Sequence, residues 1–124
     1  MNFIIIVQAR LNSKRLPGKV LANIRGVPLL TYLIERLNLE FDKSNIVIAT
    51  SNKKHDDPLH NYCLENKLKC FRGSLNNVAK RMLDASKMVE ANYFVRINGD
   101  SPLIDPSIIK LAINIYNNGK YDLV

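Results

Sequence analysis

The stretch Asn2-Phe3-Ile4-Ile5-Ile6-Val7-Gln8, near the start of the chain, contains a continuous run of apolar, largely β-branched residues. A strand with one face in water alternates apolar and polar side chains, whereas a strand buried on both faces is apolar throughout. The run from residue 2 to residue 8 is therefore expected to form a strand buried on both faces, as the strands of parallel sheets are.

Three more strands are expected further along the chain, at residues 45–50, 69–71 and 92–97, and a fifth is expected to begin at residue 121. Between the first strand and Gly26 the sequence predicts a long basic loop, because Pro17 and Gly18 interrupt any regular pattern. Strands that are separated by helices form right-handed βαβ units, and these assemble into mostly parallel sheets.

Four amphipathic helices are expected between and after these strands. The first opens at Pro28, a residue that suits a first helical position. The pairs Asp57-Pro58 and Asp105-Pro106 each predict a capping acid followed by proline, and Asn76 is expected to cap the remaining helix. The inward face of the last helix is expected to contain Ile108, Ile109, Ala112, Ile115 and Tyr116.

Together these elements predict an α/β fold of three α/β/α layers around a doubly wound, mostly parallel sheet, with strand order 3-2-1-4. In such a sheet the chain reverses direction between strands one and four, and ligands bind beyond the carboxyl ends of the strands at that point. The loops at residues 8–19 and 98–102 are therefore expected to meet over a ligand.

The net charge of +7 is concentrated near the start of the chain. No acid precedes Glu35, whereas this stretch contains five basic residues, Arg10, Lys14, Arg15, Lys19 and Arg25. A field of one sign attracts an anionic partner, so a polyphosphate, a nucleic acid and a plain solvated surface all stay open. Nucleic acid ranks low, because no aromatic residues interleave with the basic ones as stacking platforms.

Composition otherwise indicates an ordinary cytoplasmic protein with no membrane segment, since no apolar run approaches the length of a bilayer span. Cys63 and Cys70 are expected to be separate, buried, reduced thiols with no second ligand at metal-binding spacing. His55 and His60 lie five positions apart, which does not suit a shared metal ion on one helix face.

The loop from Gln8 to Lys19 lacks both the glycine spacing of a Walker loop and the G-x-G-x-x-G fingerprint. Its small residues allow close approach of the backbone, and it has cations near both ends. Such a loop suits a triphosphate, although an exposed basic loop would have the same composition.

Two further groups of polar residues have both a plain and a functional interpretation. Asp100 follows a strand and a glycine, so it is either a turn residue or a ligand of Mg²⁺, which takes one or two carboxylates together with phosphate oxygens. Arg72, Ser74, Asn76 and Arg81 surround an expected helix start. That start could hold an anion or a base edge, or these residues are only a cap and an outward-facing arginine.

Residues 6–10 and 13–19 resemble the opening signature of the CMP-sugar synthetases, which include the CMP-KDO and acylneuraminate cytidylyltransferases. Phe71 to Ser74, followed by Val78 and Arg81, resembles the spore-coat polysaccharide cytidylyltransferase branch of that group. The segment Asn98 to Leu103 is similar to its Gly-Asp-x-Pro-Leu motif. Asn76-Asn77 departs from the pattern, because acids are common there in the branch.

The resemblance implies a Rossmann-like nucleotidyltransferase fold and a Mg²⁺-dependent reaction in which a sugar hydroxyl attacks the α-phosphorus of CTP and pyrophosphate leaves. It implies catalytic roles for Arg10, Lys19 and Asp100, with Asp100 also the metal ligand. The nucleotide-binding set that it implies is Ala9, Arg10, Ser13, Lys19, Ser74, Asn76, Arg81 and Asn98. Of these, Ser74, Asn76 and Arg81 would lie near the cytosine and ribose.

Members of the group are considerably longer, so residues 1–124 are expected to be the nucleotide-binding portion of a cytidylyltransferase domain. The expected partners are CTP and a small sugar acid or related sugar, with a homodimer also expected, and the product would serve cell-surface polysaccharide synthesis. Two alternatives stay open: a non-catalytic module that binds nucleotide or a partner, and another nucleotidyltransferase or a GT-A glycosyltransferase.

Overall fold

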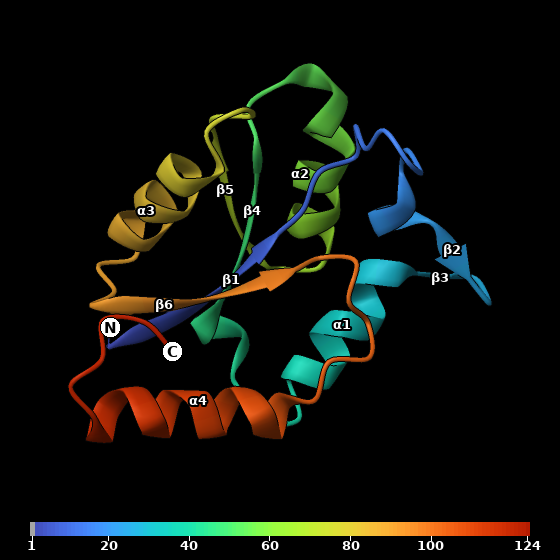
Figure 1. Ribbon diagram of the computed structural model, residues 1–124. Helices are drawn as coiled ribbons and strands as arrows, with labels where there is room; N and C mark the ends of the chain where they lie inside the picture. Colours follow the sequence, from blue (N-terminus) through green and yellow to red (C-terminus); the bar gives the residue numbers. More distant parts are fainter. Residues whose placement is uncertain (1) are drawn as a thin grey trace.

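The computed structural model describes residues 2–124. Its main sheet has four parallel strands, β1 (Phe3–Gln8), β4 (Ile46–Ser51), β5 (Lys69–Gly73) and β6 (Tyr93–Asn98), in the order β5-β4-β1-β6 (Figure 1). Counted along the chain, this is the expected order 3-2-1-4. The register pairs Gln8 with both Ala49 and Asn98, so the carboxyl ends of β1 and its two neighbours lie side by side.

Helices cover both faces of the sheet, which gives the expected three layers. One face packs against α1 (Leu29–Leu37), α2 (Asp57–Glu65) and α4 (Pro106–Asn118), and the opposite face packs against α3 (Val78–Met88). Figure 1 shows α3 apart from α1 and α4, with the sheet between them. The crossover from β5 to β6 therefore runs over the face opposite the other crossovers, and β1 and β6 flank the switch point.

The core confirms the interpretation of the first strand, because Ile4, Ile5, Ile6 and Val7 are all 0% exposed. Ile4 and Ile6 contact the α3 layer, whereas Ile5 and Val7 face the other helices. Burying a side chain of this size contributes roughly 1.5–3 kcal/mol relative to leaving it in water, so both faces of this one strand stabilise the fold.

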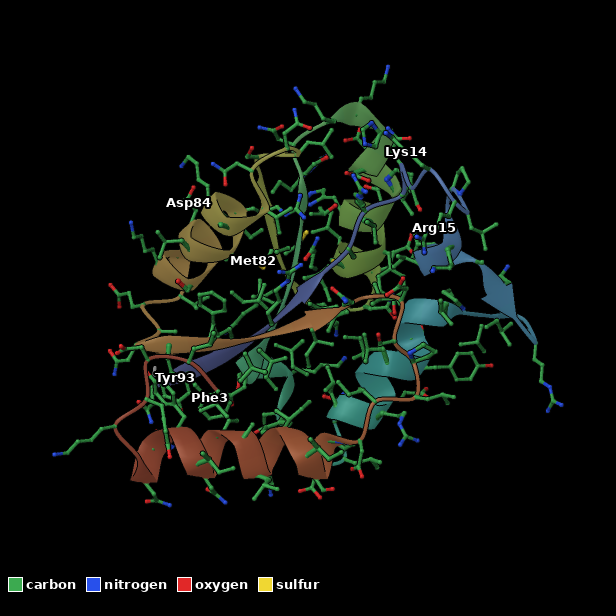
Figure 2. The ribbon with its side chains drawn as sticks, viewed as in Figure 1. Phe3, Lys14, Arg15, Met82, Asp84 and Tyr93 are labelled. Carbon is green, nitrogen blue, oxygen red and sulfur yellow. The ribbon has the colours of Figure 1, made fainter. Side chains whose placement is uncertain are left out.

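Aromatic side chains pack at the amino ends of β1 and β6. The rings of Phe3 and Tyr93 stack with centroids 5.9 Å apart, and Tyr93 approaches Tyr116 of α4 to 4.6 Å. Figure 2 shows Phe3 and Tyr93 beside α4, at the opposite end of β1 from Lys14 and Arg15. The amino ends of the strands are thus occupied by packing, and the polar loops lie at the carboxyl ends.

Two expectations near the start of the chain were wrong. The basic loop contains a short hairpin of β2 (Asn23–Ile24) and β3 (Val27–Pro28), joined by Arg25 and Gly26. Both of these residues have positive φ, 54° and 80°, as the favoured two-residue hairpin turns require. Because Pro28 pairs in this hairpin, it precedes α1 and is not its first helical residue.

The caps of the later helices also differ in part from the expectation. Helix α2 starts at Asp57, with Asp56 in the cap position, and α3 is capped by Asn77, whose side chain accepts a hydrogen bond from the Lys80 amide at 3.0 Å. The cap of α4 is confirmed, because Asp105 accepts from the Ser107 amide at 2.9 Å. Hydrogen bonds from Ser107 hold the pKa of the Asp105 carboxyl below its usual range.

The last segment differs from the expectation at two points. Residues 121–124 form no strand, although all four are described. Ile109 of α4 is buried, but Ile108 and Ile115 are 62% and 42% exposed, so the inward face of this helix is narrower than the apolar pattern predicts. Among residues 2–124, no helix has both the length and the apolar character that crossing a bilayer requires.

Candidate functional site

The loops that follow β1 and β6 meet at the carboxyl edge of the sheet and enclose a cavity of about 260 Å³. Their backbones touch, because the amide of Gly99 donates to the carbonyl of Gln8 at 2.8 Å. A Cβ atom on residue 99 would lie 3.0 Å from both the Ala9 Cβ and the Gln8 carbonyl oxygen. Glycine at this position therefore allows the close approach of the two loops.

The cavity brings together six of the site residues expected from the sequence. These are Ala9, Arg10, Ser13, Lys19, Asn98 and Asp100, and the lining also includes Gln8, Val20 and Gly99. Most of the lining is polar, with cations contributed by the first loop and a carboxylate by the second. The expected meeting of the two loops is confirmed.

Lys19 and Asp100 form an ion pair across the cavity, with 2.8 Å between Nζ and Oδ2. The hydrogen bond from Lys19 holds the pKa of the Asp100 carboxyl below its usual range. The two side chains are 39% and 40% exposed, so water reaches the pair and the net stabilisation is small. An ion pair of this kind can separate when a more highly charged ligand enters the cavity.

The loop that contains Arg10 and Lys19 is closed at its base by the backbone of Leu11. The carbonyl of Leu11 accepts from the amides of Ser13, at 3.1 Å, and Gly18, at 2.8 Å. Gly18 adopts a left-handed conformation with φ 75°, which glycine accommodates without a Cβ penalty. Because Gly18 immediately precedes Lys19, these hydrogen bonds bring the two cationic ends of the loop to one side of the sheet.

The remaining expected residues, Ser74, Asn76 and Arg81, lie outside this cavity. Arg81 is 0% exposed, and its Nη1 donates to the Ser74 carbonyl at 3.0 Å. Among residues 2–124, its Nε and Nη2 have no hydrogen-bond partner. Asn76 is exposed and its neighbour Asn77 caps α3. The structure thus places Arg81 behind the basic loop and Asn76 at the surface.

Arg81 nevertheless belongs to the electrostatic surroundings of the basic loop. Burial lowers the pKa of its guanidinium, and the positive charges of Arg10 and Arg96 lower it further. The carboxylate of Asp56 acts in the opposite direction. A buried arginine with two guanidinium nitrogens unpaired among residues 2–124 provides fixed positive potential on the α3 side of β1.

Two residues of the site region were not expected from the sequence. Gln8 lines the cavity, and its Oε1 accepts from Arg96 Nε at 2.9 Å. Asp56 is 0% exposed and accepts from the amide of Leu11 at 2.7 Å. Gln8 is the last residue of an expected strand, so the face of the sheet to which its side chain points could have been inferred from the alternation along that strand. No sequence pattern distinguishes Asp56 from the adjacent Asp57.

Both cysteines are free thiols, as expected, but only Cys63 is buried, whereas Cys70 is half-buried. The interaction of Cys63 of α2 with Cys70 of β5 lowers the pKa of the Cys70 thiol and, together with burial, raises that of Cys63. Among residues 2–124, no three His, Cys, Asp or Glu side chains cluster as a metal site. The pair lies near the amino end of β5, away from the cavity.

A larger hollow of about 600 Å³ lies between the hairpin, α1 and the Pro102–Leu103 turn. Its lining is mainly apolar, with side chains such as Leu29, Tyr32 and Leu103, and it does not include the Lys19–Asp100 pair. Phosphate groups need cations and N–H donors. The smaller, polar cavity is therefore the better match for a polyphosphate.

Comparison with known proteins identifies the family of this chain. The model of the cytidylyltransferase family matches residues 4–124. The spore coat polysaccharide biosynthesis protein SpsF of Bacillus subtilis is 35% identical over 119 residues, which cover 93% of this chain and 50% of that protein. The 3-deoxy-manno-octulosonate cytidylyltransferase of Saccharophagus degradans is 36% identical over 124 residues, covering 95% of this chain and 47% of that enzyme.

A solved cytidylyltransferase from Leptospira borgpetersenii superposes with a TM-score of 0.89 at 34% identity. The superposition covers 97% of this chain and 50% of that one, so the chain spans about half the length of the relatives that it matches. The fold is the Rossmann-like nucleotidyltransferase fold. The match extends over nearly all of the residues described above, and the chain belongs to the cytidylyltransferase family.

Proposed function

We propose that this chain is the CTP-binding portion of an enzyme that joins CTP to a sugar acid or related sugar and releases pyrophosphate. The observation that carries the proposal is the polar cavity in which Arg10 and Lys19 of one loop face Asp100 of the other. The names of the relatives supply the reaction class and the kind of sugar, such as 3-deoxy-manno-octulosonate. Cell-surface polysaccharide synthesis is proposed on the same basis.

The first step in this proposal is exchange of the Lys19–Asp100 ion pair. A triphosphate brings several negative charges, so Lys19 gains more from the phosphate oxygens than from one carboxylate. Arg10 lines the same cavity and would bind the phosphates in the same way. Ala9, a buried small residue, leaves the backbone of the loop accessible to the nucleotide. Ser13 and Asn98 would add hydrogen bonds from the two walls.

Asp100 would hold Mg²⁺ in the proposed complex. The residues present fit this ion, since Mg²⁺ typically takes one or two carboxylates and completes its shell with phosphate oxygens and water. A dedicated cage of protein ligands is not required for this ion. When bound, the ion would neutralise charge that develops on the phosphates.

The protein side chains then act by position and charge. Arg10 and Lys19 would stabilise the charge that builds on departing pyrophosphate, and the two rigid strand ends would hold the α-phosphorus in line for attack. Arg81 would contribute positive potential from behind the loop, and Ser74 and Asn76 are proposed to lie near the base and ribose. A homodimer and a cytoplasmic location also stay predictions.

The test is calorimetric titration of the protein with CTP and Mg²⁺, followed by an assay for pyrophosphate with candidate sugar acids. We expect CTP to bind more tightly with Mg²⁺ than without it, and more tightly than UTP. Pyrophosphate release in the presence of a sugar acid would support the full proposal. Binding without release would favour a nucleotide-binding module, and lack of CTP binding would refute the site assignment.

A further inference from the structure

Asp56 is a buried acid at the start of α2, where an acid usually caps the helix with its side chain. It occupies the cap position of α2, yet its side chain makes no capping hydrogen bond within the part of the chain that the structure describes. It is 0% exposed, and a carboxylate that is removed from water must have its oxygens occupied by donors. The hydrogen-bond donors that contact the Asp56 carboxylate therefore indicate its role in the structure.

Both oxygens of Asp56 accept hydrogen bonds, and one donor comes from the basic loop. Oδ1 accepts from the Leu11 amide at 2.7 Å, across 45 positions of sequence. Oδ2 accepts from the Ser51 hydroxyl at the end of β4 and lies 3.5 Å from His55 Nε2. The carboxylate thus joins the end of β4 to the residue that follows Arg10.

Leu11 is the residue on which the geometry of the basic loop depends. Its amide is held by Asp56, and its carbonyl accepts from Ser13 and Gly18. Arg10 precedes Leu11 and Lys19 follows Gly18, so both cations are next to residues that are held through the backbone of Leu11. Displacement of Leu11 would move both cationic ends of the loop at once.

We infer that Asp56 is a positioning residue for the phosphate-binding loop, acting through the Leu11 amide without touching the ligand. This inference rests on the proposed function, because it assumes that the loop binds the phosphates of CTP. Buried, charged acceptors make the stronger hydrogen bonds of proteins, and small displacements of binding groups reduce affinity steeply. The negative charge of Asp56 also raises the pKa of the buried Arg81 guanidinium, against the lowering effect of burial.

The experiment compares Asp56→Ala and Asp56→Asn with Asp57→Asn as the matched control. Asp57 is the adjacent acid, and it pairs with Arg72 at 2.8 Å away from the loop, so its variant removes the same charge from the start of α2. The Asn side chain at position 56 keeps an oxygen that can accept from Leu11. It therefore tests the role even if the Ala variant fails to fold.

The first measurement is amide hydrogen exchange by NMR, which does not depend on any ligand. We expect exchange at Leu11 to be at least about tenfold faster in Asp56→Ala, intermediate in Asp56→Asn and unchanged in Asp57→Asn, because the Ala variant removes the charged acceptor of the Leu11 amide and the Asn variant replaces it by a neutral one. Faster exchange spread evenly over α2, with Leu11 unaffected, would show that Asp56 only stabilises the helix and would overturn the inference.

The second measurement is calorimetric affinity for CTP with Mg²⁺ and for pyrophosphate alone. We expect about tenfold weaker binding of both in Asp56→Ala, a smaller loss in Asp56→Asn and no loss in Asp57→Asn. Adding Asp56→Ala to Arg10→Ala should cause less loss than it causes alone, since the effect passes through the loop. Unchanged affinity in both Asp56 variants would overturn the inference. If the unmodified protein binds neither ligand, the proposed function fails, and the exchange at Leu11 still tests the anchoring.

Discussion

Lys19 and Asp100 lie 81 positions apart in the sequence, yet their charged atoms are 2.8 Å apart at the junction of two loops. The pair joins the basic loop after β1 to the acidic turn after β6. In the proposed reaction each partner has a different task, one toward phosphate and the other toward Mg²⁺. In the proposed reaction the ion pair therefore forms only in the ligand-free protein and separates when the nucleotide and Mg²⁺ bind.

Replacing Lys19 by Met should raise the pKa of the Asp100 carboxyl toward its ordinary range, because the hydrogen bond from Lys19 is what holds it down. A depressed carboxyl pKa stabilises the fold above the ordinary pKa of aspartate, about 3.9, and the contribution is lost as pH falls through the lower, folded-state value. NMR titration of the carboxyl carbon measures the change. An identical titration curve in both proteins would contradict the ion pair.

Arg10→Ala and Asp100→Asn should affect CTP binding in different ways. Loss of Arg10 should weaken binding about tenfold to a hundredfold whether or not Mg²⁺ is present, because a charged hydrogen bond is worth roughly 1.5–3 kcal/mol. Loss of Asp100 should remove the dependence on Mg²⁺ while leaving metal-free binding intact. Calorimetry with and without the metal separates the two effects. Equal CTP affinity in both variants and the unmodified protein would argue against the site.

Gly99→Ala should both destabilise the protein and weaken CTP binding. The added methyl group meets the Ala9 Cβ and the Gln8 carbonyl oxygen at 3.0 Å, so the two loops must shift by a few tenths of an ångström to admit it. Overpacking of this kind costs about 1–3 kcal/mol, which urea denaturation can measure. Ser101→Ala, in the same turn, is a suitable control because it adds no atom. A Gly99→Ala protein of unchanged stability would show that the loops are not closely packed.

Asn77→Ala should lower the free energy of unfolding by about 0.5–2 kcal/mol, since the Asn77 side chain caps α3. Asn76→Ala should change it little, because Asn76 is exposed and precedes the cap. The two variants make the same chemical change at adjacent positions, so each is a control for the other. Chemical denaturation that ranks them in the reverse order would place the cap at Asn76.

Cys63→Ala should slow the alkylation of Cys70 near neutral pH. The hydrogen bond from the Cys63 thiol lowers the pKa of Cys70, so removing it should shift the appearance of the reactive thiolate to higher pH. Iodoacetamide labelling followed by mass spectrometry gives the rate at each pH. A Cys70→Ser protein should label weakly, because burial still raises the pKa of the Cys63 thiol when Cys70 is absent. Identical pH profiles for Cys70 with and without Cys63 would disprove the coupling.

The sequence predicted the architecture because its main determinants are local or follow general rules. The apolar run of β1 indicates burial by composition alone, and the handedness of βαβ units leaves few strand orders. The meeting of Lys19 and Asp100 could be expected, because the carboxyl ends of neighbouring parallel strands share one edge.

What the sequence did not predict depends on contacts between distant segments or on choices between equivalent neighbours. Asp56 and Asp57 look alike, and only the arrival of Leu11 from another loop makes Asp56 the buried one. Asn76 and Asn77 present the same ambiguity at a helix start. Cys63 and Cys70 meet because Lys67, with φ 55°, turns the chain sharply between α2 and β5.

The closure of the basic loop at Leu11 separates its base from its tip. The hydrogen bonds from Ser13 and Gly18 cross the base, whereas Lys14, Arg15 and Leu16 project beyond it as exposed side chains. Residues could be inserted or exchanged at this tip while the anchored ends keep their spacing. The protein thus has a segment where natural variation or engineering can add new contacts with a bound molecule without changing the hydrogen-bonded base of the loop.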